Sequence, residues 1–342
     1  MLLLDARAAR VVWTVAVFAG AAVFLYALRH VILLFVLALF FAYLIFPLVR
    51  LVQRPGRLLG RTAAIVVVYL LILGALVGVG FAVGPPLRDE VTMLTQRIPE
   101  MSQRIESGEW LGQLLGRRGV GEEQIRAVDQ FLRAHTRELI IYTQKVLAGL
   151  LGWLAGAWVV VLVPIFAFFI VKDAEHFRAG VETLLEDPHR RLWRGIADDI
   201  HALLARYVRA LVLLALVTFV VWSIVFLVSG TPYPLVLAAV GGALEFVPVL
   251  GPLAAGVVVV GVALFSGYGH PWALALFVLL WRGVQDYATS PLVMGRGVEL
   301  HPALIIFGVI AGGEIAGVTG MFLSVPAIAA LRVLWRRLGS AP

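Results

Sequence analysis

Two apolar segments near the C-terminus each combine a glutamate with residues that interrupt a helix. The first set is Glu245, Pro248, Gly251 and Pro252, and the second is Gly313, Glu314, Gly317 and Gly320. Proline lacks a backbone donor and glycine permits positive φ, so a helix breaks or turns at such runs. A carboxylate in hydrocarbon is costly unless it faces a cavity, a partner or a proton. The repeated combination predicts a pathway in which freed amides and carboxylates hold a polar solute, water or a proton.

A third polar stretch lies between these two segments. Arg282 and Asp286 are four residues apart, so a helix would place them face to face as a neutralised ion pair. Gln285 and Thr289 fall on an adjoining stripe, and Pro291 begins the turn that leaves the segment. We include these residues in the predicted pathway.

All three segments also have a structural interpretation. Small residues let helices pack closely, each glutamate could bond to a neighbouring helix, and the ion pair could only fix packing. We favour the functional interpretation because the glutamate and the helix break occur together twice.

Composition restricts the class of protein that positions these side chains. Of the 342 residues, 61% are hydrophobic and 14% are charged, and a mean hydropathy of +0.96 does not describe a soluble globule. Apolar runs long enough to cross a core of ~30 Å recur along the chain. We therefore predict an all-α integral membrane protein. The net charge of +7 comes from arginines beside the apolar runs, which indicates topology and not a nucleic-acid surface.

The apolar runs predict about eight transmembrane helices, two of them broken or re-entrant. Single spans are expected at residues 11–28, 31–49, 62–84, 146–171, 210–228 and 271–291, and longer tracts at 234–266 and 302–331. As kinked spans the two tracts give eight crossings, and as re-entrant hairpins they give six. Arginines near both ends and in the linker 50–61 predict that both termini are cytoplasmic. The first two spans are expected to turn at Arg29 and His30.

Polar insertions divide the chain into four regions. Residues 1–84 form a three-span region, 85–145 an amphipathic extracytoplasmic insertion, 146–228 two spans joined by a cytoplasmic helical linker at 172–209, and 229–342 the region with broken helices. The insertion is expected to open at the Gly84-Pro85-Pro86 run. Both polar segments have balanced charge, which favours packing surfaces over nucleic-acid binding.

The sequence lacks the motifs of several enzyme and metal-site classes. The chain has no cysteine, no phosphate-binding Gly-x4-Gly-Lys-Ser/Thr loop, no His-Glu-x-x-His pair and no Gly-x-Ser-x-Gly elbow. Asp198 and Asp199 form a lone acidic pair that we interpret as a solvated helix face. We predict that the protein is not an enzyme and uses no metal and no cofactor.

The motifs in the last third of the chain resemble a known family. They are Glu-Phe-Val-Pro-Val-Leu-Gly-Pro from Glu245, Gln-Asp followed by Ser-Pro-Leu-Val-Met-Gly from Gln285, Val-Glu-Leu-His-Pro, and Gly-Gly-Glu-Ile-Ala-Gly-Val-Thr-Gly-Met-Phe-Leu-Ser-Val-Pro ending at Pro326. In this order and spacing they resemble the autoinducer-2 exporter family. Tyr287 stands where similar proteins often have Asn, and Glu314 where they often have an apolar residue. Both departures bear on which solute is carried.

The resemblance implies a multi-pass transporter of a prokaryotic inner membrane that assembles as a homo-oligomer. Its partners would be membrane lipid, a small-molecule solute and, with ion coupling, H⁺ or Na⁺. Three functions remain open: an ATP-independent exporter of a small polar solute like autoinducer-2, a cation (Na⁺)/proton antiporter, and a non-transporting structural or regulatory membrane protein.

Overall fold

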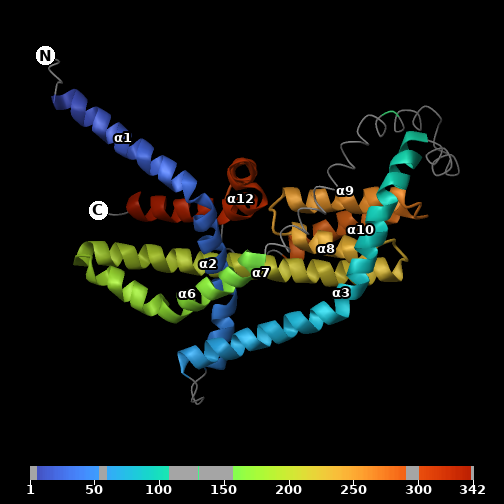
Figure 1. Cartoon of the computed structure of the whole chain (residues 1–342), viewed down its shortest axis with the longest axis horizontal. Helices are drawn as coiled ribbons and strands as arrows, with labels where there is room; N and C mark the ends of the chain where they lie inside the picture. Colours follow the sequence, from blue (N-terminus) through green and yellow to red (C-terminus); the bar gives the residue numbers. More distant parts are fainter. Residues whose placement is uncertain (1–5, 54–59, 108–129, 131–156, 290–299, 340–342) are drawn as a thin grey trace.

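A computed structural model describes residues 6–53, 60–107, 130, 157–289 and 300–339 (Figure 1). Its helices are α1 (Ala6–Ala27), α2 (Arg29–Val52), α3 (Arg61–Ser107), α6 (Ala157–Thr183), α7 (Asp187–Val228), α8 (Pro234–Leu244), α9 (Leu250–Phe265), α10 (Pro271–Val284), the π-helical turn η1 (Gln285–Thr289) and α12 (Pro302–Gly339). No strand occurs within these ranges.

Four of the described helical segments are long and apolar enough to cross a membrane. They are Val31–Val52, Arg61–Arg97, His189–Val228 and Pro302–Gly339. The prediction of an all-α membrane protein is thereby confirmed at this level, whereas the total of about eight spans stays a prediction. The expected amphipathic helices of the insertion, and the start of the expected span 146–171, lie outside the described residues.

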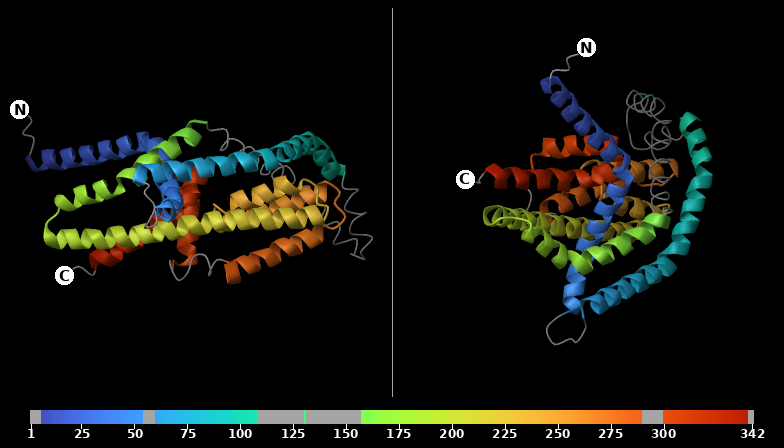
Figure 2. Two further views of the ribbon diagram at one scale, coloured as in Figure 1. Left: turned by 90° about the horizontal axis from the view of Figure 1, so that it is seen from below. Right: turned by 60° about the vertical axis from the view of Figure 1, so that its left-hand side comes forward.

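The first two apolar runs form separate helices. The chain leaves the helix at Leu28, where φ is −83° and ψ is 0°, next to the predicted turn. The Arg29 guanidinium lies 4.0 Å from the ring centre of Tyr26. Such a cation–π contact stabilises a turn that lacks glycine and proline. Figure 2 shows α1 extending away from the remaining helices.

Helix α3 continues through Gly84, Pro85 and Pro86, where the sequence predicts a boundary. Two tertiary contacts hold the continuation. Leu94 is buried in the core of the C-terminal bundle, and Glu90 Oε2 accepts a hydrogen bond from the Val236 amide at 2.9 Å. That amide is unpaired within α8 because it lies in the first turn. The second half of α3 therefore caps α8.

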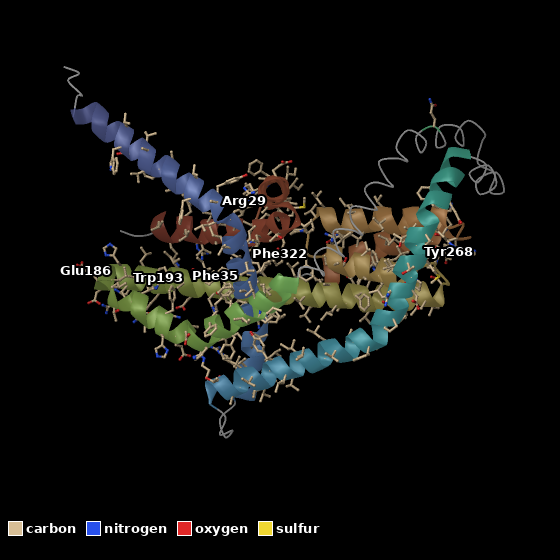
Figure 3. The ribbon with its side chains drawn as sticks, in the orientation of Figure 1. Arg29, Phe35, Glu186, Trp193, Tyr268 and Phe322 are labelled. Carbon is tan, nitrogen blue, oxygen red and sulfur yellow. The ribbon has the colours of Figure 1, made fainter. Side chains whose placement is uncertain are left out.

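Helix α7 runs along the length of the molecule. It spans Asp187–Val228, about 60 Å at 1.5 Å per residue. Glu186, which precedes it, and Tyr268, whose hydroxyl donates to the Ser229 carbonyl at 2.8 Å, lie at opposite ends of the molecule (Figure 3). The later part of the predicted cytoplasmic linker 172–209 and the predicted span 210–228 are thus one continuous helix.

One end of α7 carries a network of ion pairs, which we call the charged end. Asp199 accepts from Arg336 at 3.1 Å and from Arg337 at 2.8 Å. These bonds tie the C-terminal part of α12 to α7, so the acidic pair expected to be solvated has arginine partners.

The same network joins α6 to α7. Arg178 pairs with Asp198 at 2.8 Å, and Arg194 pairs with Glu182 at 2.5 Å. The bond from Arg194 lowers the pKa of the Glu182 carboxyl below its usual range. Because the pKa is lowered, this pair stays intact at neutral pH and is lost only as the pH falls through that lowered value.

Three hydrophobic clusters fill the bundle. The first joins α7, α8, α9 and α10 with the end of α3, the second joins α2, α7 and α12, and the third joins α2, α3 and α6. Helix α7 contributes to the first two, which therefore follow one another along its length.

A proline explains one bond between α7 and α12. Pro326 has no backbone N–H, so the carbonyl of Phe322, four residues earlier, lacks its helical partner. The buried Tyr207 hydroxyl donates to that carbonyl at 3.1 Å. The bond satisfies a backbone acceptor and fixes α12 against α7 at one level.

Tyr207→Phe should lower the free energy of unfolding by about 2 kcal/mol, because it leaves the Phe322 carbonyl unsatisfied. Thermal unfolding of the detergent-solubilised protein measures the change. Tyr287→Phe is the matched control, since Tyr287 is 89% exposed. Equal unfolding temperatures for the two variants would show that the bond does not contribute.

Candidate functional site

The predicted break at residues 248–252 is a sharp turn between α8 and α9. Val249 has a φ of +66°, which is strained for a β-branched residue. A Cβ on Gly251 would lie 1.8 Å from the Leu244 carbonyl oxygen, so only glycine fits. Pro252 stands in the first turn of α9, where its missing N–H costs little. The residue types that predicted the break therefore build it.

The two helices joined by this turn are short. α8 has 11 residues and α9 has 16, which correspond to about 16 and 24 Å. Both lengths fall below the ~30 Å of a hydrocarbon core. The tract also returns to its starting end, because Tyr268 after α9 bonds to Ser229 before α8.

Glu245 stands at the head of this turn and is 7% exposed. Its Oε1 accepts a hydrogen bond from Gln285 Nε2 at 2.7 Å and another from Thr218 Oγ1 at 3.1 Å. Gln285 Nε2 also donates to Thr218 Oγ1 at 2.9 Å, and Trp281 Nε1 donates to the same oxygen at 3.4 Å. We call Thr218, Glu245, Trp281 and Gln285 the Glu245 cluster.

The donors of this cluster are all neutral. An amide and a hydroxyl donate to a buried carboxylate, and the Trp281 indole donates to the oxygen of that hydroxyl. A buried carboxylate normally has a cationic partner. Arg282, on the same helix as Trp281, instead pairs with Asp286 at 2.8 Å. The described hydrogen bonds to the Glu245 carboxylate therefore come from neutral groups.

The ion pair predicted from the spacing of Arg282 and Asp286 is present. Its side chains are 38% and 46% exposed, so it lies at the edge of the bundle. Gln285 is the first residue of η1, and a π-helical turn of this kind often marks a functional site. The side chain of Thr289 and all of Pro291 lie outside the described residues.

The second glutamate segment also breaks its helix. Within α12, Ala316 and Gly317 leave helical φ/ψ, with Gly317 at φ +59°. A Cβ on Gly320 would lie 1.9 Å from the Gly312 carbonyl oxygen, and one on Gly313 would lie 2.7 Å from Met321 Cε. The chain therefore folds back on itself here, as the glycines predicted. We call Pro302–Gly339 the α12 hairpin.

The structure separates the two glutamates that the sequence pairs. Glu314 is exposed, and the hydrogen bonds of Glu245 come from α7 and η1, not from this segment. The prediction missed Thr218, because a single threonine in an apolar run carries little signal. Trp281, which directly precedes Arg282, had no predicted role.

A comparison with known proteins decides the family. The model of the AI-2E family transporter matches residues 13–338. The chain belongs to the AI-2E transporter family. The resemblance seen in the last third of the sequence thus extends over nearly the whole chain.

Similar proteins carry the names of transport proteins. "Putative transport protein YrrI" of Bacillus subtilis is 27% identical over 306 residues, covering 87% of this chain and 84% of the relative. "Putative transport protein YueF" of the same organism is 26% identical over 302 residues, covering 86% and 80%. "Putative permease PerM" of Escherichia coli K12 is 27% identical over 297 residues, covering 84% and 82%. Family membership and the apolar helices support a multi-pass membrane transporter.

Proposed function

We propose that this AI-2E family member exports a small polar solute similar to autoinducer-2, without ATP and by alternating access. The observation that supports it best is the Glu245 cluster, a buried carboxylate with neutral donors at the break between two short helices. Such a site offers hydrogen-bond donors and one negative charge to a solute or a coupling proton. Arg282 and Asp286 flank it, and the α12 hairpin forms the second broken element of the pathway.

The proposed topology follows from charge and from the two hairpins. Arg336 at the charged end is exposed, and so are Arg206 and Arg209 on the part of α7 that follows Asp199, which would make that end cytoplasmic. The α8–α9 tract would then be a re-entrant hairpin from the opposite side. The bond between Tyr268 and Ser229 supports this geometry. We further propose an inner-membrane location, cytoplasmic termini and a homo-oligomer.

A single cysteine at position 268 tests the topology, because the chain has no native cysteine. It should react with an impermeant maleimide only from the extracytoplasmic side. A second reporter cysteine can replace Leu253, which is 63% exposed. This position is chosen over Gly251, in the turn itself, because Gly251 tolerates no side chain. Labelling of position 268 only from the cytoplasm would show that the tract crosses the membrane.

A second candidate function is Na⁺/H⁺ antiport. It is favoured by the absence of any arginine, lysine or histidine among the described hydrogen-bond partners of Glu245. A carboxylate held this way can exchange a proton for a metal cation. In that case the ion would be the cargo itself and not a coupling ion.

Flux into proteoliposomes separates the candidates. Purified protein should move autoinducer-2 faster than protein-free liposomes do, with no ATP present. Movement of Na⁺ against H⁺ with no autoinducer-2 flux would favour the antiporter. If none of the three moves, the structural or regulatory hypothesis is favoured instead.

Thr218→Val should reduce the flux of whichever solute is moved by about tenfold, because a buried hydrogen bond contributes roughly 1 kcal/mol or more to the cluster it holds. Thr218→Ser, the matched control, retains the hydroxyl and should keep most of the flux. Initial rates in proteoliposomes measure both. Equal flux for Thr218→Val and Thr218→Ser would show that the Thr218 hydroxyl takes no part in transport.

A further inference from the structure

Two aromatic clusters lie on either side of Thr218 along α7. Toward the charged end, Phe322 contacts Phe40, Phe246 and Tyr207, with ring centres 5.2, 5.7 and 6.3 Å away. We call these four residues the Phe322 cluster. Toward the Tyr268 end, Trp222, Phe226 and Phe277 are mutually 5.4 to 6.3 Å apart, and we call them the Trp222 cluster.

The position of each cluster follows from the length of α7. Tyr207 precedes Thr218 by about 16 Å and Trp222 follows it by about 6 Å, at 1.5 Å per residue. Asp199 of the charged end lies about 12 Å further along from Tyr207. The Phe322 cluster therefore stands between the Glu245 cluster and the charged end.

Each ring of the Phe322 cluster comes from a different element. Phe40 lies on α2, Tyr207 on α7, Phe246 in the turn after α8 and Phe322 on α12. Phe246 directly follows Glu245, so the turn that presents the carboxylate also presents a ring toward the charged end. Phe40 and Tyr207 are only 5% and 6% exposed. A layer built in this way can exclude water from the carboxylate.

Few bonds hold this layer together. Where α12 meets α7 at this level, the described hydrogen bond is the one from Tyr207 to the Phe322 carbonyl. The other contacts are ring pairs, worth about 1 kcal/mol each, and the apolar packing of the second hydrophobic cluster. The α12 hairpin itself is internally tight, because the Gly312 and Gly320 backbones touch. Arg336 and Arg337 tie its C-terminal end to Asp199 of α7, so a movement that carries Phe322 away from α7 has to pivot about that end.

The Trp222 cluster is held more firmly. A Cβ on Gly241 of α8 would lie 2.4 Å from the Trp222 ring, so α7 and α8 are in close contact there. The cluster also belongs to the largest buried core of the described residues, with Leu237, Val258 and Leu274. Separating α7 from α8 would expose that core. The Phe322 cluster is the layer that opens at lower cost.

We propose that the Phe322 cluster is the gate between the Glu245 cluster and the charged end, closed in this structure and opened when the α12 hairpin moves away from α7 and the α8–α9 turn. The proposal rests on the proposed function, in that a gate controls access to a transport site. It assigns Phe40, Phe246 and Phe322 a role in access and not in binding solute.

Accessibility of one reporter cysteine tests the gate without any cargo. Thr218→Cys, in the otherwise cysteine-free chain, should react slowly with a cationic impermeant methanethiosulfonate applied at the charged end. Adding Phe246→Ala and Phe322→Ala should raise that rate by about tenfold or more, as a shift from closed to open states requires. The rate from the opposite side should stay the same.

Phe40 and Phe41 supply a matched pair on one helix. Phe40→Ala should also speed labelling from the charged end, because its ring contacts Phe322. Phe41→Ala should not, because its ring faces Tyr69 at 6.3 Å in another cluster. Equal acceleration by both variants, or acceleration from both sides of the membrane, would overturn the proposal.

A cross-link provides a second measurement if the alanine variants do not fold. Phe246→Cys with Phe322→Cys, bridged by a short bis-methanethiosulfonate, should stop flux, and a reductant should restore it. Unchanged flux in the bridged protein would contradict the gate. If the proposed function is wrong but the gate exists, the result differs. No solute then moves in any variant, but the alanine substitutions still change the labelling rate of Thr218→Cys.

Discussion

Glu245→Gln is expected to reduce flux in proteoliposomes by about tenfold or more and to abolish the dependence of the remaining flux on pH. Glutamine retains an oxygen that can accept from Thr218 and Gln285, but it cannot carry charge or exchange a proton. The hydrogen-bonded cluster should survive while its chemistry is lost. Initial rates across a series of pH values, with thermal unfolding measured in parallel, check both halves of this expectation.

Glu314→Gln is the matched control for that substitution. Glu314 is exposed and belongs to the second broken segment, so its neutralisation should change flux much less. If Glu245→Gln transports with normal pH dependence, the carboxylate only packs helices. If it unfolds instead, its main role is structural, and the proposed pathway loses its central residue.

Gly251→Ala should have the largest effect on folding, a loss of about 3 kcal/mol or more of unfolding free energy. The added Cβ would lie 1.8 Å from the Leu244 carbonyl oxygen, and backbone cannot move aside as a flexible side chain can. The turn must therefore open, which displaces Glu245 from Thr218 and Gln285. Thermal unfolding in detergent and the flux assay should both report the loss.

Gly261→Ala on the same helix is the control. Its Cβ would meet only Phe265 Cε2, at an ordinary 3.8 Å. Because alanine favours a helix over glycine by roughly 1 kcal/mol, this variant should be as stable as the wild type or more so. Similar unfolding temperatures for the two variants would mean that the turn at 245–249 is not as tight as described.

Local spacing accounts for the predictions that agree with the structure. The ion pair between Arg282 and Asp286 follows from helical periodicity, because four residues bring two side chains to one face whatever surrounds them. The breaks at 248–252 and 316–317 follow from proline and glycine, whose backbone preferences act within a few residues. The membrane class follows from composition summed over long runs.

Two features that depend on neighbouring helices are decided only in the folded chain. The run Gly84-Pro85-Pro86 does not end a helix, because Leu94 and Glu90 on the continuation of α3 find partners in the C-terminal bundle. The insertion itself stays a prediction. The two glutamates share no described hydrogen bond, because Glu314 is exposed and Glu245 bonds to α7 and η1. Their common pathway stays a prediction. No local pattern encodes such contacts.

The sequence by itself determined that this chain is a helical membrane protein of the AI-2E type, with Glu245 at a helix break. Only the tertiary structure decided what surrounds that carboxylate. Thr218 and Gln285 lie on other helices, and Phe40, Tyr207 and Phe322 come together from three more distant parts of the chain. Local preferences set where helices break, whereas the burial of side chains between helices sets which faces meet.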